Sequence, residues 1–292
     1  MTLVVARRFE GRTYMVGDTM YAPEVTDGRE GQRHFIGALK IVILHPGLVI
    51  AFANNGPNAQ RAIEGIHSNG LNLFDKTAVL SYFLEHHRRS QQGGHGAVVE
   101  FIAAIVLDDQ TSELFLIKSG DVVNVEAGYI GNVYAYNRFL HRERQVAAAA
   151  QTPSSLGVAM DALRAVIRDP DPELKSVDGL TVGLRQCAED GFLYVHSCTA
   201  EGRAIPVYDG PWAPVTFGGA PEGANTWNIG SRPGDRLGVL TAFCHTGEFG
   251  VIFCPVLNFA PRIIRNCTES GLMDASMQEV NQVVALLNPS SS

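Results

Sequence analysis

Three residues near the start of the chain, Thr2, Asp18 and Lys40, bring together a hydroxyl, a carboxylate and an amine. Thr2 follows a single methionine, and a small residue there normally permits methionine removal, so we expect Thr2 to carry a free α-amine. A threonine hydroxyl is a poor nucleophile unless a base takes its proton. An α-amine, with a reference pKa of about 7.7–8.0, can be that base. The Lys40 ammonium would favour the deprotonated amine and the alkoxide, while Asp18 could pair with Lys40 and fix its position.

Predicted strands and helices must position these residues. Short β-branched runs bounded by turns predict strands, and longer runs with an apolar side predict helices. Pairs of helices stand between groups of strands, which favours α+β layers over alternating parallel βαβ units. We therefore expect two facing sheets with helices on both outer faces. The predicted strands cover 2–8, 13–18, 40–45, 48–54, 98–107, 113–118, 121–126, 180–187 and 192–197, and the predicted helices 58–68, 75–89, 133–150 and 154–168.

The last part of the chain changes in character and predicts a second unit. Residues 199–235 are rich in glycine and proline. Strands are expected beyond them, at 236–243, 249–256 and 262–266, followed by a short helix at 274–287. We therefore predict one domain over 2–197 and a β-rich C-terminal extension over 198–292.

The stretches TLVVARRFEGRTYMVGD and LKIVILHPGLVIAFA resemble the N-terminal half of proteasome β-type subunits and their bacterial relatives, which are N-terminal-nucleophile (Ntn) hydrolases. The shared pattern is a leading threonine, an aspartate that ends the second strand and a lysine that opens the third. This resemblance implies an Ntn-type four-layer αββα sandwich, with an appended C-terminal β-rich region. It also implies that Thr2 is the nucleophile, Asp18 its acidic partner and Lys40 the residue that tunes the charge of the site.

Further site residues follow from the same resemblance. The oxyanion-hole N–H of the family falls near Ala51. A serine that helps to order the amino terminus in the family is replaced here by Ile130, and Asp178 stands where a second serine belongs. An acid at position 178 could hold the free amine, but it would also raise the pKa of that amine. Catalysis is therefore expected to involve Thr2, Asp18, Lys40, Ala51 and Asp178.

Composition excludes several other classes of protein. The 292 residues are 46% hydrophobic and carry a formal net charge of −7, which argues for a globular protein and against a nucleic-acid partner. Neither a signal peptide nor an apolar run long enough to span a membrane is found, so we expect a cytoplasmic protein with no membrane partner. Five cysteines, an odd number, predict buried free thiols. No histidine or cysteine cluster has metal-ligand spacing, so neither metal nor cofactor is expected.

Three functions remain open at this stage. The first is a threonine-type hydrolase of peptide or other amide bonds that acts through an acyl-enzyme. The second is a transpeptidase or protein ligase, in which an amine captures the acyl-enzyme instead of water. The third is a catalytically degenerate paralogue with a structural role, which the changes at Ile130 and Asp178 suggest. The resemblance also implies a homo-oligomer and an ATPase partner.

Overall fold

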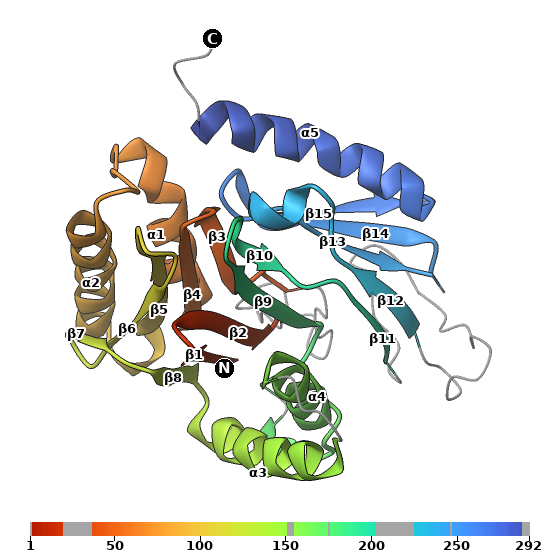
Figure 1. Cartoon of the computed structure of the whole chain (residues 1–292), viewed down its shortest axis with the longest axis horizontal. Helices are drawn as coiled ribbons and strands as arrows, with labels where there is room; N and C mark the ends of the chain where they lie inside the picture. The colour runs from red at the N-terminus through yellow and green to blue at the C-terminus, as the bar shows by residue number, and fades with distance from the viewer. Residues whose placement is uncertain are drawn as a thin grey trace.

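The computed structural model describes residues 2–19, 37–150, 155–174, 176–201, 225–245 and 247–287. Within these ranges the strands form three five-stranded sheets, and all their pairs are antiparallel. The helices lie outside the sheets (Figure 1).

The first sheet has the order β10-β9-β2-β1-β8. Its strands are β1 (Leu3–Phe9), β2 (Arg12–Asp18), β8 (Ala127–Gly131), β9 (Thr181–Cys187) and β10 (Gly191–Tyr194). Successive side chains of β1 point to opposite faces of the sheet, so each face packs against a different set of residues. Leu3 and Val5 pack against α3 (Val133–Ala149) and α4 (Ser155–Ile167), whereas Val4 and Ala6 face the central core.

The second sheet follows the chain in the order β3-β4-β5-β6-β7. Its strands are β3 (Ile41–His45), β4 (Leu48–Asn54), β5 (Val99–Val106), β6 (Ser112–Lys118) and β7 (Asp121–Asn124). On β4, Val49 and Ala51 face the central core, while Ile50 and Phe52 face the helices α1 (Gly56–Ser68) and α2 (Lys76–Gln92). The Asp75 carboxylate caps α2 by accepting a hydrogen bond from the Ala78 N–H at 3.1 Å.

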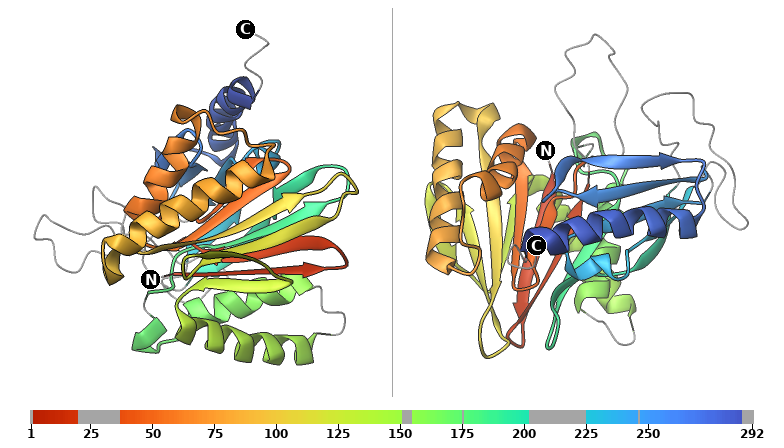
Figure 2. Two further views of the ribbon diagram at one scale, coloured as in Figure 1. Left: turned by 90° about the vertical axis from the view of Figure 1, so that its left-hand side faces the viewer. Right: turned by 90° about the horizontal axis from the view of Figure 1, so that it is seen from above.

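The third sheet has the order β11-β12-β13-β14-β15. Its strands are β11 (Ser197–Glu201), β12 (Asn225–Ile229), β13 (Leu240–Cys244), β14 (Phe249–Cys254) and β15 (Asn258–Arg265). Trp227, Ala242 and Val251 on one face join the same central core as the first two sheets. The other face packs against α5 (Glu269–Leu287), which lies across the sheet in Figures 1 and 2. Short 3-10 turns, η1 (His95–Ala97), η2 (Pro172–Leu174) and η3 (Gly234–Arg236), complete the order.

This architecture corrects the predicted fold class. The expectation of a four-layer αββα sandwich with a β-rich appendage is wrong, because the described chain forms three separate five-stranded antiparallel sheets. The physical reason is the apolar face of the third sheet. It contributes fully buried side chains such as Trp227 and Val251 to a core cluster shared with the other two sheets, so two sheets alone would leave that cluster open on one side.

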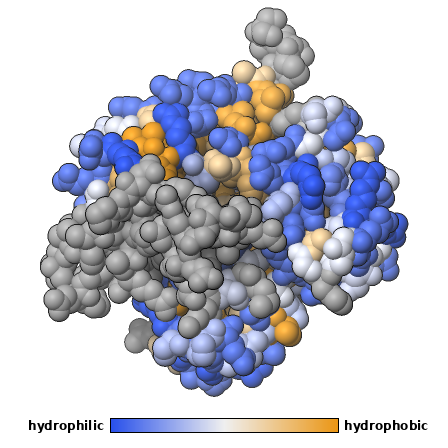
Figure 3. All heavy atoms as spheres, turned by 180° about the vertical axis from the view of Figure 1, so that it is seen from behind, coloured by the Kyte–Doolittle hydropathy of each residue, from blue (hydrophilic) through white to orange (hydrophobic). Residues whose placement is uncertain are grey.

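Apolar side chains at the surface are scattered. The large exposed ones among the described residues are Phe9, Phe74, Val123, Val133 and Val284. On the face seen from behind, the visible described surface is mostly hydrophilic, with small apolar patches toward the top of the view (Figure 3). None of the helices in the described ranges is long and apolar enough to cross a membrane.

Candidate functional site

Thr2, Asp18 and Lys40 meet at one end of the first two sheets. Thr2 immediately precedes β1 and Asp18 ends β2, and the antiparallel register, which pairs Val4 with Gly17, brings these strand ends together. Lys40 immediately precedes β3 in the second sheet and reaches across to them. Residues 38 positions apart in sequence thereby share one site.

Hydrogen bonds join the three side chains directly. The Thr2 hydroxyl donates to Asp18 Oδ1 at 2.5 Å, and the Leu3 backbone N–H donates to the same oxygen at 2.9 Å. Lys40 Nζ donates to Asp18 Oδ2 at 2.7 Å and also contacts Thr2 Oγ1. The carboxylate therefore orients the hydroxyl, while the cation lies against the oxygen on which negative charge would develop in a nucleophilic attack.

The site is buried and charged. Thr2 and Lys40 are each 3% exposed, and Asp18 is 1% exposed. Burial lowers the pKa of Lys40 from its ordinary value, and the charge and hydrogen bond of Asp18 oppose that shift. Two buried charges are tolerated here because they are paired and hydrogen-bonded.

The strand β8 and the start of α3 form the wall behind Thr2. The Asn132 N–H donates to the Thr2 carbonyl oxygen at 2.8 Å, and the Asn132 side chain caps α3 by accepting from the N–H groups of Tyr134 and Ala135. Next to it, the Gly131 N–H donates to Glu100 Oε2 at 3.1 Å. The backbone of Thr2 is therefore fixed from a neighbouring strand as well as by Asp18.

Substituting Gly131 is expected to displace Thr2. Gly131 has a φ of +100°, and a Cβ built there would lie 1.9 Å from the Thr2 carbonyl oxygen. Gly131→Ala should therefore lower the free energy of unfolding by more than about 2 kcal/mol and disrupt any chemistry at Thr2. Denaturant unfolding checks the first effect. Gly128→Ala on the same strand is the control, because its Cβ would meet nothing closer than 3.6 Å. Equal losses in the two variants would contradict this description of the wall.

The other predicted site residues lie in different settings. Ala51 is inside β4, paired with Ile41 on one side and Ile102 on the other, so its backbone groups belong to the sheet ladder and cannot serve a substrate. Ile130 pairs with Val4 and is buried in the central core. The carboxylate of Asp178 accepts a hydrogen bond from the Gly179 N–H at 2.8 Å.

The loop that carries Asp178 does approach the site. The Leu180 N–H donates to Thr19 Oγ1 at 2.9 Å, and Thr19 follows Asp18 directly. In the same loop, Ser176 Oγ accepts a hydrogen bond from the Asn132 side chain at 3.2 Å. The loop therefore touches both sides of the site, through Thr19 and through the residue that binds the Thr2 carbonyl.

Sequence reasoning missed Asn54 at the end of β4. Phe52 N–H donates to the Lys40 carbonyl at 3.0 Å, and N–H groups two residues apart in a strand point to the same side. The N–H of Asn54 is therefore directed to the side of β4 on which Lys40 lies, just beyond it. Asn54 has a φ of +74°, a conformation that asparagine tolerates better than most residues. The Asn54-Asn55-Gly56 run at the end of a predicted strand was the available signal.

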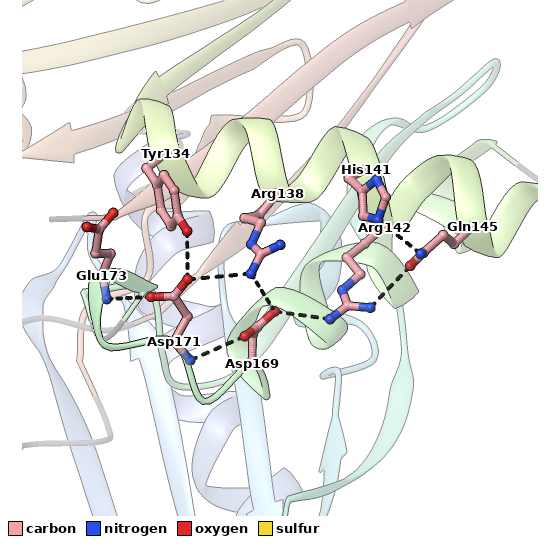
Figure 4. Close-up of polar contacts among 8 residues, drawn as sticks. All are labelled: Tyr134, Arg138, His141, Arg142, Gln145, Asp169, Asp171 and Glu173. Atoms are coloured by element: carbon pink, nitrogen blue, oxygen red, sulfur yellow. Dashed lines mark hydrogen bonds and ion pairs between the residues drawn. The ribbon is translucent and has the colours of Figure 1, made fainter.

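A polar network holds the start of α3 in place (Figure 4). Its members lie on α3 and on the turn after α4: Tyr134, Arg138, His141, Arg142, Gln145, Asp169, Asp171 and Glu173. Tyr134 donates to Asp171 at 2.6 Å, and this hydrogen bond is the main cause that lowers the pKa of Asp171. The network thus ties the first turn of α3, which Asn132 caps, to the loop leading to Asp178.

Burial makes two of the cysteine thiols weaker nucleophiles than an ordinary thiol. None of the five cysteines forms a disulfide bond, and burial raises the pKa of Cys254 to about 12 and raises that of Cys267. The expectation that all are buried is wrong for Cys198, which is exposed, while Cys187 and Cys267 are half-buried. In the described residues, no group of three or more His, Cys, Asp and Glu side chains could hold a metal ion.

Two grooves of the described surface lie away from Thr2. One, of about 870 Å³, lies at the opposite end of β1 and β2, and the other, of about 740 Å³, lies along β10 and η3. The Thr2 cluster is the better candidate site, because it combines a hydroxyl, a carboxylate and a cation, whereas the size of a groove alone says nothing of its chemistry.

No protein-family model matches the chain, and no curated protein is significantly similar to it.

Proposed function

We propose that the protein is a threonine-type amide hydrolase that acts through an acyl-enzyme on Thr2. The observation that carries this proposal is the direct contact of the Thr2 hydroxyl with both Asp18 and Lys40. A hydroxyl held between an acceptor and a cation is poised to become an alkoxide. The resemblance of residues 2–18 and 39–53 to proteasome β-type subunits supports the same chemistry.

The proposed reaction begins once the residue before Thr2 has been removed. The free α-amine takes the hydroxyl proton, and Thr2 Oγ1 forms a bond to the substrate carbonyl carbon. The carbon–nitrogen bond then breaks, and the leaving amine receives the proton from the α-ammonium. Water attacks the ester with the α-amine again as base, which releases a carboxylic acid and restores Thr2. Lys40 stabilises charge on Oγ1, and the Asn54 N–H is the proposed donor to the developing oxyanion.

One observation favours a second candidate, a catalytically silent protein in which the cluster is structural. All three side chains are at most 3% exposed, as expected for an internal ion pair that fixes the ends of β1, β2 and β3. The two candidates differ in whether Thr2 ever forms a covalent bond with a substrate.

Turnover of a mixed library of short peptide amides tests the proposal. The wild-type protein, its mass first checked for a chain that begins at Thr2, should release free acids that are absent with Thr2→Ala. Added hydroxylamine should divert part of the product to hydroxamates, because it intercepts the acyl-enzyme. A transpeptidase would instead join the acyl group to a peptide amine in the library. The silent-protein candidate predicts no product of any kind.

The pH dependence of kcat/KM should be bell-shaped. Activity rises with pH as the α-amine loses its proton and becomes a base, and falls as Lys40 loses the proton that keeps it cationic. Because burial lowers the pKa of Lys40, the falling limb should lie below 10.5, the ordinary value for lysine. Initial rates across the pH range measure both limbs. Lys40→Arg, if it folds, should move the falling limb upward, and an unchanged limb would assign it to another group.

A further inference from the structure

The two grooves away from Thr2 share one residue, the exposed Arg185 on β9, which lines both of them. The first groove runs between the β1–β2 turn, α3 and α4, and the second runs along β10 and η3. Figure 2 shows α3 and α4 lying beside the sheet that contains β1 and β2. At roughly 3.3 Å per residue, the far end of β1 is about 20 Å from Thr2, so this surface is separate from the candidate active site.

Two of the four acidic side chains that line the grooves, Glu143 and Asp190, are paired with an arginine, and a third, Asp235, is held in hydrogen bonds. Glu143 forms two hydrogen bonds with Arg7, at 2.7 and 2.6 Å. Asp190 pairs with Arg236 at 2.6 Å, and Asp235 is held by His196 and by the Ser231 N–H. The negative charges of Glu143 and Asp190 are therefore offset by their own arginine partners and do not cancel the charge of the other arginines.

Four exposed arginines line the grooves with side chains that form no ion pair or hydrogen bond within the described residues: Arg12, Arg144, Arg185 and Arg232. Of the acidic side chains that line the grooves, Glu10 alone forms no ion pair or hydrogen bond within the described residues. The four arginines outnumber the groove acids that have no arginine partner, so the grooves carry a surplus of positive charge, although the whole chain has a formal net charge of −7. Guanidinium groups bind carboxylates with two parallel hydrogen bonds, so the surplus complements an acidic ligand.

We propose that these grooves form a docking track for an acidic peptide segment of a partner protein or substrate. An exposed ion pair contributes little by itself, so a ligand must engage several arginines at once. Each groove alone has the volume of a small-molecule pocket, about 300–1,000 Å³, but both are lined by Arg185, so a ligand that contacts both must be an extended chain and not a small anion. Phe9, 60% exposed, and the half-buried Leu156 offer apolar contact between the charges.

Fluorescence anisotropy with a labelled peptide of three Glu-Glu-Phe repeats tests the track. We expect saturable binding that weakens with added salt, and no binding of the Lys-Lys-Phe counterpart. Arg12→Glu, Arg185→Glu and Arg232→Glu should each weaken binding about threefold or more, and the triple variant more than about tenfold. The exposed Arg61→Glu on α1, outside both grooves, should change binding less than twofold.

Several results would overturn the track. These are absence of binding at millimolar peptide, equal binding by the triple variant, or equal binding of the lysine peptide. Displacement of the peptide by an equal concentration of inorganic phosphate would reduce the track to a simple anion site, which also contradicts the proposal. Because the readout is binding, it can be repeated with Thr2→Ala, and its outcome does not depend on the proposed hydrolase activity.

Discussion

Thr2→Ala is expected to abolish covalent chemistry, with the rate of acyl-enzyme formation falling by at least about a thousandfold. The physical reason is that the hydroxyl between Asp18 and Lys40 is the proposed nucleophile, and alanine leaves no atom in its place. Alanine is also small enough to permit removal of the preceding methionine. The rate can be followed as accumulation of acyl-enzyme by intact mass spectrometry.

Two controls separate this chemical effect from damage to the fold. Thr2→Ser keeps a hydroxyl and should retain measurable acylation. Thr19→Ala removes the neighbouring buried hydroxyl, which accepts from Leu180 N–H, and should cost stability while keeping acylation within tenfold of wild type. Acylation that survives in Thr2→Ala would show that another residue is the nucleophile.

Lys40→Met is expected to lower the free energy of unfolding by about 3–5 kcal/mol. Methionine fills a similar volume but carries no charge, so the Asp18 carboxylate stays buried without its cationic partner. The same variant should lose acylation, because the charge beside Oγ1 is gone. Guanidinium denaturation measures the stability loss.

The matched control is Lys76→Met, which removes an exposed lysine paired with Glu113 at 2.9 Å. That loss should be at most about 1 kcal/mol. Adding Asp18→Asn to Lys40→Met should restore most of the stability without restoring acylation, because the buried charge is then removed. A loss in Lys40→Met no larger than in Lys76→Met would contradict the description of a desolvated ion pair.

Local patterns in the sequence were sufficient to predict most of the strands and helices. The predicted strands at 2–8, 13–18 and 48–54 are confirmed as β1, β2 and β4, because alternation and turn residues act over a few neighbours. The strands β8, β11 and β12 were missed. Ala127–Gly131 contains two glycines and is extended because it pairs with β1, a partner more than 100 residues away, which no local pattern reveals.

The missed strands explain the wrong fold class. Without β11 and β12, the C-terminal strands were an appendage, whereas with them they complete a third sheet. Whether that sheet shares a core with the others depends on whether Trp227 and Val251 point inward, and this is set by tertiary packing.

The site depends on tertiary packing in the same way. Thr2, Asp18 and Lys40 were found from residue type and spacing. Asn132 contacts Thr2 through its backbone N–H, and Asn54 is proposed to act through the same group, which any residue but proline carries.

The most direct measurement of the central proposal is the intact mass of the protein after exposure to a peptide epoxyketone, with the modified residue located by fragmentation. The proposal predicts a chain that begins at Thr2 and carries one inhibitor molecule, bound through the Thr2 amine and hydroxyl. A chain that retains its methionine and gains no mass would contradict a threonine hydrolase and leave the cluster as a buried structural ion pair.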